Sequence, residues 1–508
     1  MLFSARPWAY WLGERVHPSR LTLEALTTLF AIWPLCLLAY VFAARLTYPI
    51  DLEWCEGGSL YEAYRLLHGL PIYTRGNPAW APFPYPPLHT VAIAILGAFR
   101  LDFWTARIVS IVFFGLLCGS LFRVIYRHLN RSAFGVATGA LVLAMVACGY
   151  PVIGQWYDLS RVDTMMMALV VMGLATLGNH KLTTSQIVRV ALLFTAAIYT
   201  KQTAALLVAW GCGFACFRDL KSGIRLSGMT FLACLVLLGL LQWLSDGGFW
   251  FWTVAGLANH NIEDAHVTEG LRHIWEFTPL FGVVPFLALL LAIKGRLSDR
   301  SILWVGAFLA SIPASLLPYA KAGGFLNNLM PMIVLGGPAL VLPIADIARQ
   351  ATGWSVLARW GLLASLVAIV WQNPLKIDEY VPTARDRQAA RELNALVASH
   401  KGGLVVNYLE FLPGRNGHTN PQWHCMAVWD SIWRGQPMNE IDAYEKTGAR
   451  WALFHSRDIG EYANYVRRHS RLVEKLPDSS RIRMITGAAV VIDELWERTA
   501  KPTRAPNH

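Results

Sequence analysis

Long apolar runs recur along almost all of this 508-residue chain, and they limit its fold more than any other feature. The hydrocarbon core of a bilayer is about 30 Å thick, so a helix needs roughly 20 apolar residues to cross it. Charged residues make up only 15% of the chain. A soluble domain has about 25%. We therefore predict a polytopic α-helical membrane protein. Runs that approach the required length are 21–44, 103–124, 133–150, 162–178, 226–244, 280–293 with its flanks, 302–318, 329–347 and 354–371.

The net charge of +11 follows from Lys and Arg residues that lie in the gaps between these runs. Basic residues are not gathered on one tail or amphipathic face, so the charge is a topology signal and not a sign of nucleic-acid binding. By the positive-inside rule the basic gaps are cytoplasmic, which places the N-terminus inside. These gaps are 6–20, 123–131, 180–189, 218–225, 294–300 and 349–359.

Two segments fit this alternation only in an unusual form. Residues 88–99 are too few to span, so we expect them to be re-entrant or to lie on the outer surface. Residues 188–217 are too many for one span and have basic residues at both ends, which predicts a hairpin of two half-helices that turns at Thr200, Lys201 and Gln202. The membrane domain, 1–372, then has eleven spans. Its last span leaves the C-terminus outside the cytoplasm.

The remaining chain has the pattern of a soluble domain. Residues 389–400 and 441–448 repeat apolar positions at helical spacing, whereas 403–409 and 451–454 read as strands. We predict a small extracytoplasmic α/β domain over 373–496. Residues 497–508 are polar and carry two prolines, so we expect a disordered tail.

The cysteines show no metal-binding spacing, because the sequence has neither a CxxC pair nor a Cys/His cluster. Most of them lie inside apolar runs, where a small apolar side chain is sufficient explanation. Only Cys55 and Cys425 fall in outer segments, which are oxidising in many cells. A disulfide between them is a prediction of this placement.

The first outer loop, 47–87, carries three carboxylates close to a span end, Asp51, Glu53 and Glu56, within the run DLEWCEGG. Neighbouring like charges and nearby hydrocarbon both disfavour ionisation, so one of these groups is a candidate general base. The alternative is a solvated acidic turn. We rank Glu53 first, then Asp51, then Glu56, because Glu56 stands at a helix start where a cap or metal contact is an alternative role.

Two further features follow in the same loop. Residues 58–69 place apolar side chains on one helical face with Glu62 and Arg65 turned away, which predicts a short helix at the membrane interface. The run APFPYPPLHT at 81–90 must be stiff and extended. It is either a rigid connector or a groove in which Tyr85 packs against a lipid or sugar.

Charged residues at the mouths of spans form a second group of candidates. Arg161 lies at the end of the second outer loop, 151–162, and Asp163 directly follows that loop. The two either pair together or serve a ligand. Lys201 and Gln202 are placed at the hairpin turn, beside the free N-terminus of the second half-helix, where charge and unsatisfied N–H groups attract anions. A Lys inside an apolar run is a functional candidate by default.

Two later outer loops add polar residues. Residues 246–277 contain His260, which as a single histidine is more often a surface residue than a catalyst. Residues 318–328 contain Asn327 and Lys321, and Lys321 beside glycines is a candidate second phosphate contact.

Carboxylates and cations on one side of the membrane suit the displacement of a phosphate leaving group. The base deprotonates an acceptor hydroxyl while Lys and Arg stabilise the departing phosphate. ATP is absent outside the cytoplasm, and the sequence contains no P-loop or GxGxxG. A lipid-linked phosphate therefore fits as the donor.

The order of these motifs resembles the GT-C glycosyltransferases: an EG before a short helix, G-x-P-I-Y, Y-P-P, R-V-D at a span mouth and T-K-Q in a hairpin. The resemblance is to bacterial members akin to the protein O-mannosyltransferases, the 4-amino-arabinose lipid A transferase and the rhizobial galacturonosyltransferases. It implies transfer of a sugar from a polyprenyl-phosphate carrier to an envelope glycan, lipid or protein, at the outer face of a bacterial inner membrane.

The same resemblance assigns roles to particular residues. A first-loop carboxylate is the general base, Glu56 before Gly57 matches the acidic-glycine step, and Lys201 matches a phosphate-contacting cation. Arg161 and Asp163 match the second-loop pair. Many relatives carry an adjacent Asp-Glu pair, whereas here the three acidic residues are spaced apart. No organic cofactor is implied, and a divalent cation is neither required nor excluded.

Two alternatives from other classes stay open. A transporter or lipid flippase also carries intramembrane charges and broken helices, but it is expected to show paired repeats and polar residues near the bilayer midplane. A non-catalytic assembly or polymer-binding factor is the other. An acid-free first loop in close relatives would favour that last alternative.

Overall fold

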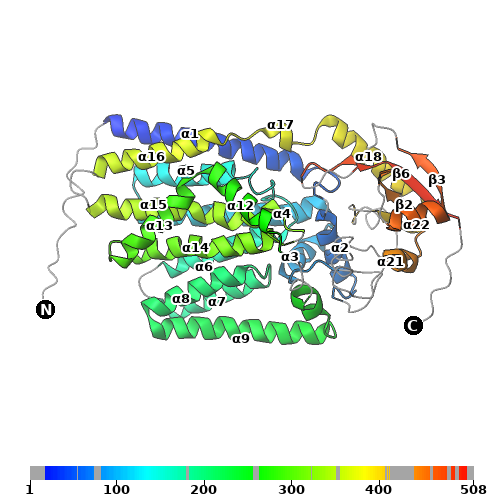
Figure 1. Ribbon diagram of the computed structural model, residues 1–508, viewed down its shortest axis with the longest axis horizontal. Helices are drawn as coiled ribbons and strands as arrows, with labels where there is room; N and C mark the ends of the chain where they lie inside the picture. The colour runs from blue at the N-terminus through cyan, green and yellow to red at the C-terminus, as the bar shows by residue number, and fades with distance from the viewer. Residues whose placement is uncertain are drawn as a thin grey trace.

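The fold is described from a computed structural model, in which a bundle of helices carries a small sheet at one end (Figure 1). The sheet lies near the C-terminal end of the first helix of the bundle (Figure 1). The structure describes residues 18–53, 55–73, 82–178, 182–255, 262–321, 323–350, 355–406, 409, 411, 440–457, 461–476, 482–486 and 491–499.

Each apolar segment expected to span the membrane falls on a helix of the bundle. The segment expected to form a hairpin falls on two helices. The helices are α1 (Pro18–Leu46), α4 (Phe103–His128), α5 (Ala133–Cys148), α6 (Val162–Leu177), α7 (Thr184–Ile198), α8 (Ala204–Arg218), α9 (Leu220–Leu244), α13 (Leu280–Ile293), α14 (Asp299–Tyr319), α15 (Met330–Gln350) and α16 (Ser355–Gln372).

Five described helices are long and apolar enough to cross a bilayer, and two bent helix pairs raise the number to seven. The other apolar helices, such as α6 with 16 residues, are about 24 Å long at about 1.5 Å per residue. The eleven-span count therefore stays a prediction. Burial separates the long helices by position, because 89% of the apolar window of α15 is buried and only 11% of that of α9. The helix α15 thus forms the centre of the bundle, and α9 lies at its edge (Figure 1).

The described residues of several basic gaps lie at the end of the bundle away from the sheet (Figure 1). Arg218 at the end of α8 pairs with Asp299 at the start of α14, with 3.1 Å between Nε and Oδ2. The His128 ring at the end of α4 approaches Asp346 of α15 at 3.1 Å, and Arg349 donates to the His128 carbonyl. Charge thus collects at one end, as the sequence predicts, whereas the cytoplasmic assignment of that end stays a prediction.

Short helices cover the opposite end. After α1, the chain forms α2 (Glu56–Leu67) and α3 (Leu88–Gly97), which lie beside the start of α4 (Figure 1). With ten residues α3 is about 15 Å long, and its expected re-entrant or surface position stays a prediction. The rest of this end is formed by α10 (Gly248–Trp250), the π-helical turn η1 (Phe251–Ala255), α12 (Asp264–Phe277) and the 3₁₀ turn η2 (Leu326–Leu329).

The predicted orientation of α2 is wrong. Glu62 and Arg65 were expected to face away from the apolar side, yet they are only 4% and 6% exposed. Glu62 accepts hydrogen bonds from the Phe83 N–H and the Thr90 hydroxyl, both at 2.8 Å, and Arg65 donates to the Pro71 carbonyl. The proline-rich segment and α3 thus cover the side of α2 that a lone interfacial helix would present to water.

The predicted break between α7 and α8 is confirmed, since residues 199–203 separate two antiparallel helices of 15 residues each. Thr183 caps α7 with a capping box to Gln186. The turn brings Lys201 and Gln202 to the same end of the bundle as α2 and α3.

The C-terminal part combines helices with a four-stranded sheet of order β1-β2-β6-β3. The strands β1 and β2 are parallel, so the chain needs a crossover, which α21 provides. The four predicted segments of regular structure fall on α18, β1, α21 and β2. The elements are α17 (Ile377–Tyr380), α18 (Ala384–Ser399), β1 (Leu404–Val406), α21 (Glu440–Thr447), β2 (Trp451–Phe454), α22 (Glu461–His469), β3 (Ser470–Lys475), β6 (Glu494–Arg498) and the separate pair β4 (Ile482–Arg483) and β5 (Val491–Ile492).

The predicted domain boundary at 496 falls inside β6. This strand continues to Arg498, and Glu497 accepts hydrogen bonds from Arg450 and Arg471. Arg471 lies on the neighbouring strand β3, and Arg450 directly precedes β2 on the other side of β6, so Glu497 is held from both sides. Residues 500–508 of the expected disordered tail lie outside the described residues.

Candidate active site

Glu56 fixes the start of α2 through hydrogen bonds to several segments. It is the first residue of α2, is fully buried and receives two hydrogen bonds from the Arg107 guanidinium, at 2.8 and 2.7 Å. The backbone N–H groups of Leu52 and Ser160 donate to the same carboxylate at 2.9 and 3.1 Å. Burial opposes ionisation, but the charge and hydrogen bonds of Arg107 outweigh it and lower the pKa of Glu56. A carboxylate so fully satisfied is a poor proton acceptor.

Arg107 shapes the loop as well as holding Glu56. This fully buried residue of α4 donates to the carbonyls of Arg45, Tyr48 and Ile50, at 2.9, 2.7 and 2.7 Å. One guanidinium group thereby holds three carbonyl groups at the end of α1 and in the turn that follows it. Sequence reasoning did not single out Arg107, although a charged residue within the apolar run 103–124 is the signal that could have found it.

Asp51 is buried beside the start of α2. Its Oδ1 accepts a hydrogen bond from the Gly57 N–H at 2.6 Å, while its Oδ2 has no partner among the described residues. Burial, reinforced by the charge of Glu56, raises the pKa of Asp51 well above its ordinary range. The group is therefore biased towards its protonated form.

Glu53 differs from both neighbours because its two oxygens are buried without a hydrogen bond of ordinary geometry in the described part of the chain. The nearest cation is Arg161, whose Nη1 lies 3.6 Å from Oε2. Burial raises the pKa of Glu53 to about 7, although the charge of Arg161 opposes the rise. A carboxylate with this pKa, whose oxygens no described residue binds at ordinary hydrogen-bond geometry, has the properties of a general base.

Arg161 lies among aromatic rings. Its guanidinium carbon is 4.7 Å from the ring centre of Trp156, 5.1 Å from that of Phe83 and 5.9 Å from that of Tyr85. Such rings favour the charged form while leaving the N–H groups available to an anion. The sequence left open a pair between Arg161 and Asp163. The structure shows no ion pair between them, because Arg161 turns to Glu53.

Asp163 is paired with Lys201 instead, at 2.7 Å between Oδ1 and Nζ. The same oxygen accepts from Asn327 at 3.0 Å, and Lys201 also donates to the Asn328 side chain at 2.8 Å. Lys201 lies 5.8 Å from the ring centre of Tyr85, so this ring contacts Lys201 and Arg161 alike. Residues from four distant segments thus meet at one end of the bundle.

Gln202 secures the proline-rich segment. Its side-chain N–H₂ donates to the carbonyls of Pro84 and Thr253, both at 2.7 Å. Tyr85 follows Pro84 directly, so this bridge helps to position the ring that both cations contact. The role of Gln202 seen here is structural, within the cluster that the sequence predicted.

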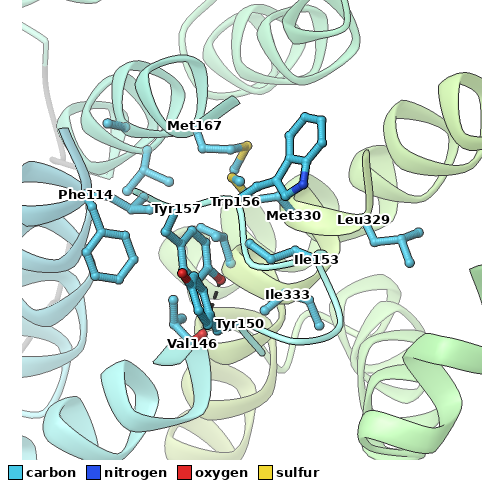
Figure 2. Close-up of a cluster of buried hydrophobic side chains, with 14 of the residues drawn as sticks. Phe114, Val146, Tyr150, Ile153, Trp156, Tyr157, Met167, Leu329, Met330 and Ile333 are labelled. Carbon is cyan, nitrogen blue, oxygen red and sulfur yellow. Dashed lines mark hydrogen bonds between the residues drawn. The ribbon is translucent and has the colours of Figure 1, made fainter. Parts of the chain in front are cut away.

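The second outer loop is held by a buried network that sequence reasoning also missed. Arg45 pairs with Asp158 at 3.1 Å, and the Tyr150 hydroxyl donates to Asp158 at 2.7 Å. Gln155 has a positive φ of 67°, a conformation that is strained for a non-glycine residue, and its carbonyl accepts from Arg45 at 3.3 Å. In Figure 2, Trp156 and Tyr157 extend from this loop into a buried apolar cluster that includes Met330 and Ile333.

Lys321 lies on the outer loop before η2, where its backbone forms a bridge with Ile262. His260 and Cys425 lie outside the described residues, so the disulfide between Cys55 and Cys425 stays a prediction. No three described His, Cys, Asp or Glu side chains are arranged to hold a metal ion.

Comparison with solved structures identifies the fold. The chain superimposes on ArnT from Cupriavidus metallidurans bound to undecaprenyl phosphate with a TM-score of 0.58 and 11% identity, over 93% of this chain and 99% of that chain. The apo form of the same protein gives 0.56 and 13%, over 91% and 97%. ArnT is the 4-amino-arabinose lipid A transferase, a GT-C superfamily member. The chain has a GT-C-like fold.

Comparison of the whole sequence with known sequences gives no match. No protein-family model and no curated protein sequence matches the chain. An archaeal relative of the fold, the oligosaccharyltransferase of Archaeoglobus fulgidus, has a TM-score of 0.49 and 10% identity over 87% of this chain and 70% of that chain. At these identities the likeness concerns the fold alone, and the residues of the candidate site carry the functional argument.

Proposed function

We propose that the protein is a membrane glycosyltransferase with Glu53 as its general base. The donor is a sugar linked to a polyprenyl phosphate, and the acceptor is an envelope glycan, lipid or protein at the outer face of a bacterial inner membrane. The observation that carries this proposal is the buried Glu53 carboxylate, which no described residue binds at ordinary hydrogen-bond geometry and which lies 3.6 Å from Arg161, itself set among aromatic rings. The likeness to a transferase solved with undecaprenyl phosphate supports the choice of donor.

The proposed reaction is a single inverting displacement. Glu53 takes the proton of an acceptor hydroxyl as its oxygen attacks the anomeric carbon of the sugar. The bond from that carbon to the phosphate oxygen breaks, and polyprenyl phosphate leaves with the electron pair. Arg161 and Lys201, which lie 5.9 and 5.8 Å from the ring centre of Tyr85, stabilise the negative charge that develops on the phosphate.

The test replaces the carboxylate by its amide. Glu53→Gln keeps the shape of the side chain but removes proton acceptance, so the turnover rate should fall by about 100-fold or more while donor binding changes little. The measurement uses purified protein in lipid nanodiscs with a set of undecaprenyl-phosphate sugars and a crude envelope glycan acceptor. Glu263→Gln, at a half-exposed outer carboxylate outside the cluster, is the matched control.

The pH dependence adds a second readout. Because only ionised Glu53 accepts a proton, the wild-type rate should rise with pH through about 7, its raised pKa, and Glu53→Gln should lack that rise. Wild-type transfer rates in the amide variants of Asp51, Glu53 and Glu56 alike would contradict the assignment of the catalytic loop. The flippase alternative would then be the better explanation.

A further inference from the structure

The carbonyl of Leu52, the residue before Glu53, is bound by the C-terminal domain. It accepts hydrogen bonds from the N–H of Ile485 at 3.2 Å, the N–H of Thr486 at 2.9 Å and the hydroxyl of Thr486 at 2.9 Å. Thr486 is 3% exposed and lies 434 residues away along the chain. A carbonyl oxygen has two lone pairs, so the three donors share them, and the Thr486 hydroxyl is the one donor of the three that a side-chain substitution removes.

The other side of Leu52 is fixed as well. Its N–H donates to Glu56 at 2.9 Å, and Glu56 is held by Arg107 of α4. The peptide group that connects Leu52 to Glu53 therefore cannot rotate without breaking hydrogen bonds to the C-terminal domain. The bundle holds one side of this short segment, and the C-terminal domain holds the other.

A second contact joins the same two parts. Phe411 of the C-terminal part is 3% exposed, and its ring packs edge-on against Phe103 at the start of α4, with 5.8 Å between ring centres. Its backbone nitrogen lies so near Gly57 that a Cβ on this glycine would come within 2.9 Å of it. The C-terminal domain thus packs directly on the loop that carries Glu53.

We propose that Thr486 is a positioning residue for the candidate base, and that the C-terminal domain is in this way part of the catalytic site. This inference rests on the proposed role of Glu53. The latch, defined as the hydrogen bonds from Ile485 and Thr486 to Leu52, keeps the carboxylate directed at Arg161 and closed to water. Its loss leaves Glu53 present but poorly oriented, which affects the chemical step more than donor binding.

The test is Thr486→Val, which keeps the branched shape and removes the hydroxyl donor. We expect roughly a five- to tenfold fall in kcat with an unchanged KM for the undecaprenyl-phosphate sugar, the usual size of one lost hydrogen bond. Thr486→Ser restores the hydroxyl and should recover the rate. Thr447→Val is the matched control, because Thr447 is a buried threonine of the same domain whose hydroxyl bonds to the Tyr444 carbonyl, away from the loop.

Two further readouts separate positioning from stability. Hydrogen exchange of residues 50–57 should quicken in Thr486→Val and not in Thr447→Val. The pH at which the transfer rate rises should also fall below about 7, because water that reaches Glu53 stabilises its ionised form. In this variant Glu53 still faces Arg161, Glu56 and Asp163. A wild-type kcat and a wild-type pH for this rise in Thr486→Val would overturn the proposal, as would an equal loss of kcat in Thr447→Val.

The exchange measurement also distinguishes this proposal from the proposed function. If Glu53→Gln retains transfer, the role of Glu53 fails, while quicker exchange of residues 50–57 in Thr486→Val still supports the latch. Unchanged exchange in Thr486→Val overturns the latch whatever the result for Glu53→Gln.

Discussion

Asp51, Glu53 and Glu56 lie within one short turn, yet each has a different set of partners. Glu56 is ionised and held by Arg107, Asp51 accepts from the Gly57 N–H, and Glu53 lies 3.6 Å from Arg161. The pKa of Glu53 is raised from 4.5 to about 7, so the folded protein binds this proton more tightly than the unfolded chain. The contribution of Glu53 to folding stability therefore falls as pH rises from about 4.5 to about 7.

Lys201 should differ from Glu53 in its kinetic signature. Removing a cation that contacts the donor phosphate in both ground and transition states weakens binding and rate together. We expect Lys201→Ala to lower kcat/KM by about 10- to 100-fold, the size of one hydrogen bond to a charged group, with a raised KM for the donor. Steady-state kinetics with the undecaprenyl-phosphate sugar measures both.

The control for this variant is Lys376→Ala, at an exposed lysine outside the cluster. Thermal unfolding of the Lys201→Ala protein should also be followed, because Asp163 loses its ion-pair partner. An unchanged donor KM with a reduced kcat would contradict a phosphate contact and assign Lys201 to positioning Asp163.

Single residues show where sequence reasoning succeeds and where it stops. Lys201 was found because a charge in an apolar run needs a partner, and Arg107 satisfies the same rule but was passed over. The roles of Asp51, Glu53 and Glu56 could not be separated by sequence, because they depend on Arg107 and Arg161, which lie in other segments. The distances from these carboxylates to the two arginines are set by tertiary packing, which the sequence pattern does not show.

At the scale of elements, the start of α2 has no room for a larger residue. A Cβ at Gly57 would come 2.6 Å from Asp51 Oδ1 and 2.9 Å from the backbone nitrogen of Phe411. Gly57→Ala should therefore displace the loop and reduce transfer by about tenfold or more, even though alanine favours helices. The assay is transfer activity at matched amounts of folded protein.

Gly119→Ala on α4 is the comparison for this substitution, since nothing lies within 4 Å of a Cβ added there. It should leave the transfer rate unchanged. Wild-type activity in Gly57→Ala would show that the loop and Phe411 yield without cost to the site.

The periodicity of the sequence predicted where the helices lie better than it predicted which residues pack against them. The break between α7 and α8 followed from length and from basic residues at both ends, which are local signals. The orientation of α2 was wrong because Glu62 is covered by Phe83 and Thr90 from a segment that the helical pattern does not describe. Amphipathicity reports one apolar face, whereas α2 is packed on several sides.

At the scale of the whole molecule, the topology itself is testable. The basic gaps gather at one end of the bundle, and the candidate site lies at the other (Figure 1). Reporter fusions after Arg127, Lys221 and Arg296 should report the cytoplasm. Fusions after Gly76, His260 and Gly402 should report the outer side. A cytoplasmic signal at Gly402 would contradict the proposed location of the reaction.

The C-terminal domain illustrates a limit at this scale. Its first helices and strands were predicted from local patterns, but the order β1-β2-β6-β3 joins strands that are distant in sequence. The hydrogen bonds of Thr486 to Leu52 are similarly long in sequence separation. Neither pairing leaves a periodic signal, so both become visible only in three dimensions.

The candidate site lies at the ends of membrane-length helices, and this position determines how the proposed donor reaches it. A lipid-borne donor reaches such a site without leaving the bilayer, so the encounter is a search in two dimensions. The concentration that governs turnover is then the number of donor molecules per unit of membrane area. Adding inert phospholipid to proteoliposomes slows the proposed reaction by dilution within the surface, whereas adding buffer leaves its rate unchanged.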